Sequence, residues 1–547
     1  MPKNGLTRLH DDHHHHWPTE IDVVVVGSGA AALAGAATAA TLGLSTIVLK
    51  KSGFIGGTSA YSGGGMWLPG NAVLARNGVA EDKGSGYRYL RSVVGADMTE
   101  STATAFTQAA PDLVDLLESA LGVQLGWHRF PEYFDSEDRI EGGRTIFPEP
   151  LDAESFGRLV EYIRPPLPAD QFEMPVDRSL LRGGQSLVAQ LLRAFLTFEH
   201  CEVWTCSPVS RLVWDGGAVV GVAVTTQVGE RVLRARRGVL LACGGFEQNA
   251  ELRERFQGRT GAVGTASAPE TNTGDSLGMT ASRGVRTALL DEAWWCPATV
   301  FPNGRAAFTL GVHGGFFVDA TGRRFVNESA PYDEVGRAIG KLPAASAGDA
   351  EVWWIFDSAS TEPPGVCSAP IDLGHFRRAG LMHEAETAGA LAVELGIDPG
   401  TLALSTLRFN THVAAGHDPD FGRGIDEFDR HFGDGARANP ALAPVSTPPL
   451  RALRVVLGDL GTKGGLVTDE DAQVVREDGS LVEGLFAAGN AAASISRHTY
   501  PAPGFPLGSG MTFAYRAARA MGVRAGRGSE AGQPRWPDEV ESGDDAG

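Results

Sequence analysis

Cysteine is scarce in this chain. Its 547 residues include five cysteines, an odd number, and no two of them form a CxxC pair. A disulfide framework needs an even set at regular spacing, so none is expected. Scattered thiols are typical of a reducing compartment, and we expect a cytoplasmic protein. The cysteines are Cys201, Cys206, Cys243, Cys296 and Cys367.

Long apolar segments are also missing. No run approaches the ~18 residues of a membrane span, and the polar N-terminus has no apolar core of a secretory signal. We therefore expect no transmembrane segment, although loose membrane association stays open. The run His13–His16 invites a metal-binding interpretation. Because no other ligand cluster lies near it in the sequence, we interpret it as part of a solvated N-terminal arm and expect no metal centre.

Basic residues are outnumbered by acidic ones. The chain has 47 Lys and Arg against 66 Asp and Glu, which gives a net charge of −19. Nothing resembles a basic groove, so we expect no nucleic-acid partner. The abundant features are 71 glycines and a hydrophobic fraction of 43%. This composition is typical of a soluble globular enzyme that is rich in turns.

The segment Ile21–Lys51 organises the chain. Four consecutive valines, Val23 to Val26, predict a strand buried on both faces, and Gly27-Ser28-Gly29 leads directly into an Ala-rich helix. A second apolar strand follows at Ser45–Leu49. Gly27 allows a tight turn, and Gly29 lets the backbone approach a pyrophosphate at the helix N-terminus. Ala32 takes the place of the third glycine, so the pattern predicts a βαβ dinucleotide-binding unit.

One position departs from this pattern. The acidic residue that usually binds the ribose at the end of the second strand is absent, and Lys50 stands there with Lys51 beside it. A cation suits a 2′-phosphate, so this position by itself leaves NADP open. The C-terminal part of the chain favours FAD instead.

Further elements follow in order. The Gly-rich segment Phe54–Asn71 predicts a loop that brings N–H groups and hydroxyls close to an extended ligand. We predict helices at Lys83–Val94, Ser101–Leu121 and Ser186–Phe198. We predict strands at Val203–Trp214 and Val219–Thr226, joined at Asp215-Gly216-Gly217, and a buried strand within Val232–Gly245 that returns to the first sheet.

The segment Gly484–Ala520 predicts a strand that ends at Gly489-Asn490 and, after a loop, a helix that begins near Leu507. The N–H groups at this helix N-terminus suit the pyrimidine edge of a reduced flavin. Tyr500 and Gly504 lie in the loop between them. A phenol and a backbone N–H on one tight loop can form an oxyanion hole for a carbonyl oxygen.

We therefore predict the α/β fold class, with an FAD-binding Rossmann-type domain of the GR2 type and an inserted α+β substrate or catalytic domain. The predicted limits are 1–17 for a flexible arm, 18–290 and 457–525 for the two parts of the FAD domain, 291–456 for the inserted domain, and 526–547 for an acidic disordered tail.

Several motifs together resemble the 3-ketosteroid Δ1-dehydrogenases, which belong to the flavoprotein group of the fumarate reductases and succinate dehydrogenases. They are GSGAAAL, GGTSAYSGGGMWLPGN, NTGDSLGM, NESAPY, GDLGTKGGLVTD and the C-terminal AAGN, YPAPG and GSGMTFAY. The resemblance extends from about Ile21 to Met521.

The resemblance implies roles for individual residues. Tyr500 in TYPAPG and the N–H of Gly504 would bind the C3 carbonyl of a steroid, and Tyr332 in NESAPY would take a proton from C2. Tyr133 in RFPEYF would assist this base. Hydride would then leave C1 for N5 of FAD. The implied substrate-pocket residues are Phe130, Phe308 and Pro503.

The resemblance also implies FAD bound without a covalent link, a 3-ketosteroid substrate in steroid catabolism, and an unidentified electron acceptor, with a quinone or the respiratory chain as candidates. The implied cofactor-binding residues are Gly27, Gly29, Ala30, Ala31, Lys50, Lys51, Gly57, Thr58, Ser59, Ser62, Gly63, Gly64, Gly65, Met66, Val209, Ala242, Gly244, Asp275, Gly489, Asn490 and Leu507.

Three other interpretations stay open. One is a 3-ketosteroid Δ4-(5α)-dehydrogenase or related desaturase that acts at C4–C5. Another is a fumarate reductase-like ene-reductase, which would need cations for a dicarboxylate, with Arg497 and His498 as the candidates beside the loop. The third is a flavin-binding protein without catalytic activity.

Overall fold

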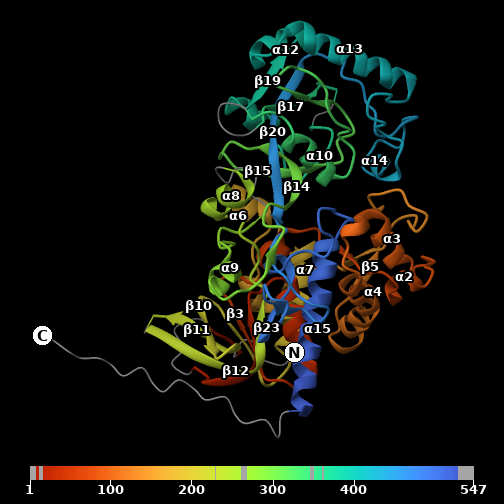
Figure 1. Cartoon of the computed structure of the whole chain (residues 1–547). Helices are drawn as coiled ribbons and strands as arrows, with labels where there is room; N and C mark the ends of the chain where they lie inside the picture. The colour runs from red at the N-terminus through yellow and green to blue at the C-terminus, as the bar shows by residue number, and fades with distance from the viewer. Residues whose placement is uncertain are drawn as a thin grey trace, which may run out of the picture.

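The computed structural model describes residues 8–10, 17–227, 229–259, 268–344, 350–359 and 362–527. Within these ranges the chain forms two large sheets with helices packed around them, as the α/β prediction requires (Figure 1). None of the described helices is both long and apolar enough to cross a membrane.

The first sheet has nine strands in the order β1-β9-β3-β2-β12-β11-β10, with β23 beside β12 and β22 beside β23. Pairing between β9, β3, β2, β12 and β23 is parallel, whereas β10, β11 and β12 form an antiparallel meander. The strands are β1 (Leu9–His10), β2 (Glu20–Val26), β3 (Thr46–Leu49), β9 (Cys201–Trp204), β10 (Val209–Asp215), β11 (Ala218–Thr226), β12 (Gly229–Leu241), β22 (Gln473–Val475) and β23 (Leu481–Ala487).

The valine run in β2 explains why this sheet is buried on both faces. Val23 and Val25 pack in the same cluster as helices α1 (Ala30–Thr41), α7 (Gly183–Phe195) and α15 (Phe505–Arg527). Val24 and Val26 pack in a second cluster with residues of β10, β11 and β12. Alternate residues of a strand point to opposite faces, so this strand has no solvent-facing side.

The second sheet has seven strands, all antiparallel, in the order β16-β17-β20-β14-β15-β18 with β19 beside β20. Its long strand β20 runs from the upper part of the molecule toward the first sheet (Figure 1). The strands are β14 (Ala293–Val300), β15 (Ala306–Leu310), β16 (Phe316–Asp319), β17 (Val352–Phe356), β18 (Val366–Cys367), β19 (Met382–Ala385) and β20 (Leu450–Thr462).

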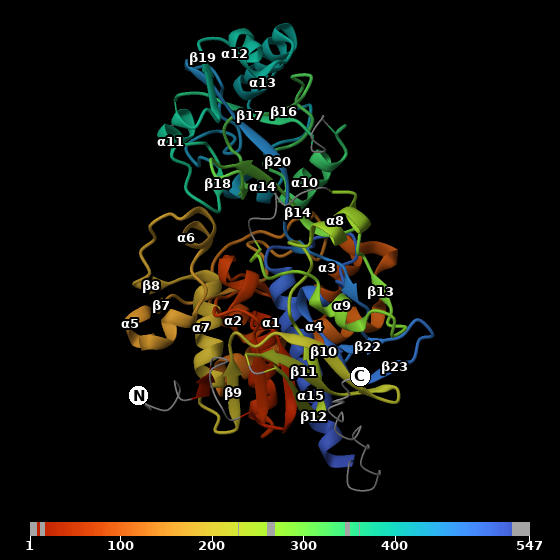
Figure 2. The ribbon, with the colours of Figure 1, turned by 90° about the vertical axis from the view of Figure 1, so that its left-hand side faces the viewer.

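Smaller elements complete the molecule, and α5, α6, β7 and β8 lie together beside α7 in Figure 2. The short strands are β4 (Met66–Trp67), β5 (Leu125–Trp127), β6 (Thr145–Pro148), β7 (Leu151–Asp152), β8 (Leu180–Leu181), β13 (Thr287–Ala288) and β21 (Gly465–Leu466). The remaining α-helices are α2 (Ala72–Arg76), α3 (Ser85–Val94), α4 (Glu100–Asp115), α5 (Ala153–Phe156), α6 (Leu167–Phe172), α8 (Ala250–Gln257), α9 (Asp275–Thr280), α10 (Tyr332–Gly340), α11 (Leu373–Arg378), α12 (Ala388–Leu395), α13 (Pro399–Ala415) and α14 (Glu427–His431).

One predicted strand is wrong, because the segment does not form a single strand. Val203–Trp214 contains the end of β9, a turn and most of β10. Cys206 in the turn has φ 52°, which no strand allows. The hairpin at Asp215-Gly216-Gly217 is confirmed, because Asp215 pairs with Ala218 and Gly216 has φ 56°.

The other element predictions are confirmed with shifted ends. Helix α7 begins at Gly183 instead of Ser186, and α15 begins at Phe505 instead of Leu507. The domain limits stay a prediction, and β20 continues across the limit set at 456. Leu9–His10 of the predicted arm form an edge strand. The described residues do not include 1–7 and 11–16 of this arm, and so not the run His13–His16. They also do not include residues 528–547 of the predicted tail.

A buried ion pair holds the segment between β5 and β6. Arg144 donates from Nη1 to both carboxylate oxygens of Glu132 at 2.6 and 2.8 Å, and neither side chain is exposed. Trp67 Nε1 also donates to Glu132 at 2.7 Å. Tyr133 follows Glu132 directly, so this pair fixes where the Tyr133 backbone lies.

We expect Arg144→Met to reduce the free energy of unfolding by about 3 to 5 kcal/mol, because it leaves the carboxylate of Glu132 buried without its counter-ion. Arg88→Met is the control, since the ion pairs of Arg88 with Asp82 and Asp138 are exposed and we expect less than about 1 kcal/mol. Denaturant unfolding of both variants measures the difference. Equal losses would contradict this account of Glu132.

Candidate active site

The turn between β2 and α1 forms a cradle for an anion. Gly27 has φ +116°, and a Cβ atom there would lie 2.1 Å from the carbonyl oxygen of Ala242 at the end of β12. Gly29 caps α1 without a side-chain hydrogen bond, and no acidic residue lies in the first turn. The N–H of Ala30 meets Ser59 Oγ at 3.0 Å. The helix dipole and the remaining N–H groups, including that of Ala31, therefore face the predicted pyrophosphate position.

The Gly-rich loop is folded tightly against this cradle. Residues Gly57–Tyr61 form a short 3₁₀ turn, Thr58 Oγ1 accepts from Asn272 at 3.0 Å, and Ser62 Oγ accepts from the N–H of Gly64 at 3.1 Å. Gly64 has φ +74°, and a Cβ there would lie 2.5 Å from the backbone of Gly183. The segment is therefore a built loop and not a flexible linker.

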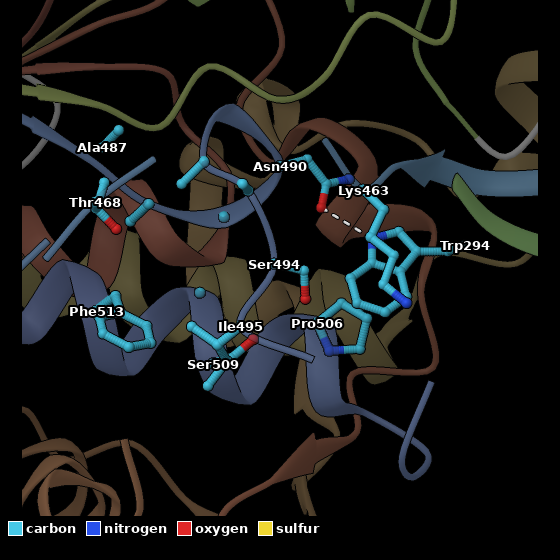
Figure 3. A pocket seen from close by; sticks show the side chains of 15 residues that line it. Trp294, Lys463, Thr468, Ala487, Asn490, Ser494, Ile495, Pro506, Ser509 and Phe513 are labelled. Carbon is cyan, nitrogen blue, oxygen red and sulfur yellow. Dashed lines mark hydrogen bonds between the residues drawn. The ribbon is translucent and has the colours of Figure 1, made fainter. Parts of the chain in front are cut away.

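The C-terminal segment meets the N-terminal motif in space. A Cβ atom at Gly489 would lie 3.4 Å from Ala31 Cβ, and one at Gly510 in α15 would lie 3.1 Å from the Gly489 backbone. Figure 3 shows the pocket between the Gly489-Asn490 turn and the first turns of α15. Its lining includes Ser494, Pro506 and Ser509. The two motifs predicted for one ligand thus border one site.

Lys50 follows β3 and is buried, with 7% of its surface exposed. Burial, helped by Arg164 and Lys51, lowers the pKa of its ammonium to about 8. Its Nζ has no hydrogen bond or ion pair among the described residues, whereas Lys51 Nζ contacts Thr273 at 2.9 Å and Asp275 at 2.9 Å. Lys50 therefore offers its ammonium group at the ribose position to an acceptor atom of a ligand.

The other residues predicted to bind the cofactor lie in the Gly-rich loop and at the ends of strands and helices. Gly63, Gly65 and Met66 continue the loop into β4, Val209 begins β10, and Gly244 follows β12 with φ +85°. Leu507 is half-buried in the first turn of α15.

Three tyrosines from distant parts of the sequence meet in one buried cluster. Tyr133 comes from the loop after β5, Tyr332 is the first residue of α10, and Tyr500 precedes α15. Their ring centroids lie 5.2 to 5.5 Å apart, and all three side chains are buried. Helix α10 packs closely on β14, because a Cβ at Gly336 would lie 2.6 Å from the backbone nitrogen of Cys296.

Aromatic side chains surround this cluster. Phe308 lies 4.7 Å from Tyr332, Trp294 4.9 Å from Tyr500, and Phe428 4.9 Å from Tyr133, measured between ring centroids. The predicted pocket residue Phe130 stacks on Phe428 at 6.3 Å, so Phe428 stands between Phe130 and Tyr133. Phe308 is therefore beside the tyrosines, as predicted, and Phe130 is one ring further away.

Burial raises the pKa of all three phenols. For Tyr332 the neighbouring hydroxyls of Tyr133 and Tyr500 add to the effect of burial. For Tyr500 burial raises the pKa, while the Tyr332 hydroxyl and the N–H of Gly504 lower it. The hydroxyl of Tyr133 is buried without a hydrogen bond of ordinary geometry among the described residues. At neutral pH the cluster therefore presents protonated phenols, which donate hydrogen bonds.

The loop that carries Tyr500 is held through its carbonyl groups. Tyr89 Oη donates to Pro501 at 2.8 Å, Thr145 Oγ1 to Pro503 at 2.6 Å, and the N–H of Trp67 to Gly504 at 3.1 Å. The N–H of Gly504 is left to point toward the Tyr500 hydroxyl. A phenol and an N–H that converge in a buried site can polarise a carbonyl oxygen.

Sequence reasoning missed several residues of the site. Trp294 and Phe428 are ordinary core residues in any local pattern, and only the tertiary structure brings them to the tyrosines. Glu132 precedes Tyr133 in the chain, but its buried ion pair with Arg144 carries no sequence signal. Lys463 lies within the GDLGTKGGLVTD motif, but its burial beside Trp294 carries no sequence signal.

The comparisons with known proteins agree with this site. Residues 22–507 match the model of the FAD binding domain family. The glycine cradle, the helix N-termini and the buried Lys50 fit such a dinucleotide, and together with this match they define a flavoprotein whose cofactor is FAD.

Two relatives and one solved structure show to which group of flavoproteins the chain is similar. The 3-oxosteroid 1-dehydrogenase of Mycobacterium tuberculosis is 32% identical over 93% of this chain and 99% of the relative. The 4-oxocyclohexanecarboxylate 2-dehydrogenase of Sinomonas cyclohexanicum is 33% identical over 92% and 93%. The 3-ketosteroid Δ1-dehydrogenase of Sterolibacterium denitrificans, solved with 1,4-androstadiene-3,17-dione, superposes with a TM-score of 0.84 at 31% identity and covers 92% of this chain and 100% of its own. The chain belongs to the FAD-binding family of the 3-oxosteroid 1-dehydrogenases.

We expect the affinity of the apoprotein for FAD to depend on Lys50 and on pH. A charged donor is worth about 1.5 to 3 kcal/mol, so Lys50→Met should weaken FAD binding about 10- to 100-fold at pH 7. The wild-type affinity should be full below pH 8 and fall as pH rises through the lowered pKa of Lys50, because the neutral amine loses the charged interaction. Lys50→Arg should keep its affinity across this range. Titration by flavin fluorescence between pH 6.5 and 9.5 checks this, and equal, pH-independent affinities for wild type and Lys50→Met would contradict it.

Proposed function

We propose that this protein catalyses the FAD-dependent 1,2-dehydrogenation of 3-ketosteroids. The observation that carries the proposal is the convergence of Tyr332 on Tyr500 and the Gly504 N–H in one buried site. Relatives that match nearly the whole chain carry the name of this activity, and they support the assignment.

Tyr500 and Gly504 act on the C3 carbonyl in this proposal. A proton at C2 becomes acidic only when the enolate that forms on its removal is stabilised. Two donors fixed at the carbonyl oxygen supply this stabilisation, and loss of one such donor typically costs about 10² to 10³ in rate. Both donors lie on a loop anchored at Pro501, Pro503 and Gly504, so they need no reorganisation when charge develops.

Tyr332 takes the C2 proton. As the first residue of α10 it lies where the helix dipole favours a negative charge. The hydroxyl of Tyr133 beside it has no other partner among the described residues and can accept or relay the proton. FAD, when bound, supplies the two-electron acceptor for the hydride that leaves C1. The product is a C1=C2 double bond conjugated with the C3 ketone.

The fumarate reductase-like alternative has less support at this site. Of its two candidate cations, His498 is exposed and held by Glu292 at 2.8 Å. The likeness to a flavocytochrome c3 fumarate reductase and to a 3-ketosteroid Δ4-(5α)-dehydrogenase, at 22% and 21% identity, shows the fold alone.

A smaller ring ketone is the second candidate substrate. The Sinomonas relative, named for 4-oxocyclohexanecarboxylate, is as similar to this chain as the steroid enzyme is. The proton abstraction beside a ring ketone is the same, so the tyrosine cluster serves both substrates, and a direct comparison decides between them.

The test is to mix the FAD-loaded protein anaerobically with androst-4-ene-3,17-dione. We expect the oxidised-flavin absorbance to bleach and the 1,4-diene to form. Bleaching with 4-oxocyclohexanecarboxylate alone would favour the second candidate. Protein that stays oxidised with both ketones would contradict the proposal, and fumarate and C4–C5 substrates would be tested next.

We expect Tyr332→Phe to reduce kcat about 10²- to 10⁴-fold, the contribution of a positioned general base, with FAD content unchanged. Because burial raises the pKa of Tyr332, its basic form grows as pH rises, so wild-type kcat should increase from neutral to alkaline pH. Tyr515→Phe is the matched control, since Tyr515 is buried in α15 and contacts Arg519 at 2.9 Å. Near-normal turnover of Tyr332→Phe would remove this residue from the mechanism.

A further inference from the structure

Lys463 is a buried lysine for which the proposed mechanism has no role. It follows β20 directly, and 1% of its surface is exposed. Its Nζ donates to the carbonyl oxygen of Thr499 at 2.6 Å and lies 4.4 Å from the centroid of the Trp294 ring. Figure 3 shows the Lys463 side chain running along this ring.

The two contacts of Lys463 lead to Tyr500 by different routes. Thr499 precedes Tyr500 in the chain, and its carbonyl oxygen accepts from Lys463 Nζ and from Ser496 Oγ at 2.7 Å. Trp294 packs against the Tyr500 ring with 4.9 Å between centroids, and its Nε1 donates to Asn490 at 3.2 Å. Lys463 therefore supports Tyr500 through its backbone and through its ring.

A third interaction leads to Tyr332. Asp333 follows Tyr332 in α10, and its negative charge raises the pKa of Lys463 against the effect of burial, without an ion pair between the two side chains. Asp333 Oδ2 accepts from Arg337 at 2.8 Å, while Oδ1 is buried without a hydrogen bond among the described residues.

The other charged groups around Lys463 balance each other. Arg337 of α10 binds Glu292, which lies just before β14, at 2.7 Å, and Glu292 also accepts from His498 at 2.8 Å. Burial lowers the pKa of Lys463 to about 7, with Asp333 and Glu292 opposing this shift and Arg337 adding to it. Burying the charged ammonium of a lysine costs free energy, so packing alone does not account for Lys463 at this position.

We propose that Lys463 is a positioning residue for 1,2-dehydrogenation, which fixes Tyr500 through Thr499 and Trp294 so that its phenol faces the ketone substrate beside Tyr332. The inference rests on the proposed function. Lys463 acts through Thr499 and Trp294. Its ammonium group matters because it donates to the Thr499 carbonyl oxygen and lies over the Trp294 ring at the same time.

The test compares Lys463→Met with Lys463→Arg, each loaded with FAD. A displacement of reacting groups by about 1 Å costs about 10² in rate, so Lys463→Met should lower kcat about 10²-fold with KM changed less than about 3-fold. Lys463→Arg, which keeps the cation, should recover most of this loss. Lys341→Met, an exposed lysine at the end of α10, is the control and should match the wild type.

The outcomes separate positioning from simple stabilisation. If Lys463→Met lowers the thermal midpoint while its folded, FAD-loaded fraction keeps wild-type kcat, the inference is overturned. If Lys463→Met does not fold, Lys463→Gln takes its place, and full activity in that variant also overturns the inference. A wild-type protein without turnover on any ring ketone overturns the proposed function and this inference together, whereas an active wild type with an unaffected Lys463→Met overturns this inference alone.

Discussion

The close contact between the backbones of Gly504 and Gly65 is the constraint on which the site depends. Gly504 has φ +80°, and a Cβ there would lie 2.5 Å from the carbonyl group of Gly65. The contact joins the loop predicted to hold FAD with the loop that carries Tyr500. The N–H of Trp67 binds the Gly504 carbonyl at 3.1 Å and keeps the two loops in register. The N–H of Gly504 then remains available beside the Tyr500 hydroxyl.

Burial has opposite consequences for the donors and for the base of this site. A phenol with a raised pKa keeps its proton, which suits Tyr500 as a donor to a carbonyl oxygen. The same burial opposes ionisation of Tyr332, so its basicity depends on its place at the start of α10 and on the Tyr133 hydroxyl. The nearby charges of Lys463 and Arg337 are balanced by those of Asp333 and Glu292, so this group adds no large net charge to the tyrosines.

Much of the fold could be predicted because its signals are local. The valine run, the glycine turn and the Ala-rich helix gave β2 and α1 within a few residues. The predicted strand Val203–Trp214 was wrong because the chain turns sharply at Cys206, and the signal of Pro208 just before β10 was outweighed by the apolar residues on either side. The predicted end of a helix differed from the observed one where glycines form part of the helix, as at Gly183 in α7.

The site could be predicted only in part from the residues themselves. Tyr500 and Gly504 share one loop, so their convergence follows from local sequence. Tyr332 and Tyr133 were assigned by resemblance, since nothing local shows that three tyrosines from separate segments meet. Lys463 and Trp294 meet because β20 pairs with β14, a contact between distant strands that no short motif encodes. Such long-range pairings set the surroundings of a site, and burial then sets its pKa values.

If residues of this chain remove the C2 proton, exchange at C2 proceeds even when hydride transfer is blocked. The most direct measurement is the loss of deuterium from C2-deuterated androst-4-ene-3,17-dione in ordinary water, followed by NMR, with protein whose FAD has been reduced beforehand. We expect catalysed exchange at C2 for the wild type and its loss in Tyr332→Phe. No exchange in the wild type, or equal exchange in both proteins, would contradict it.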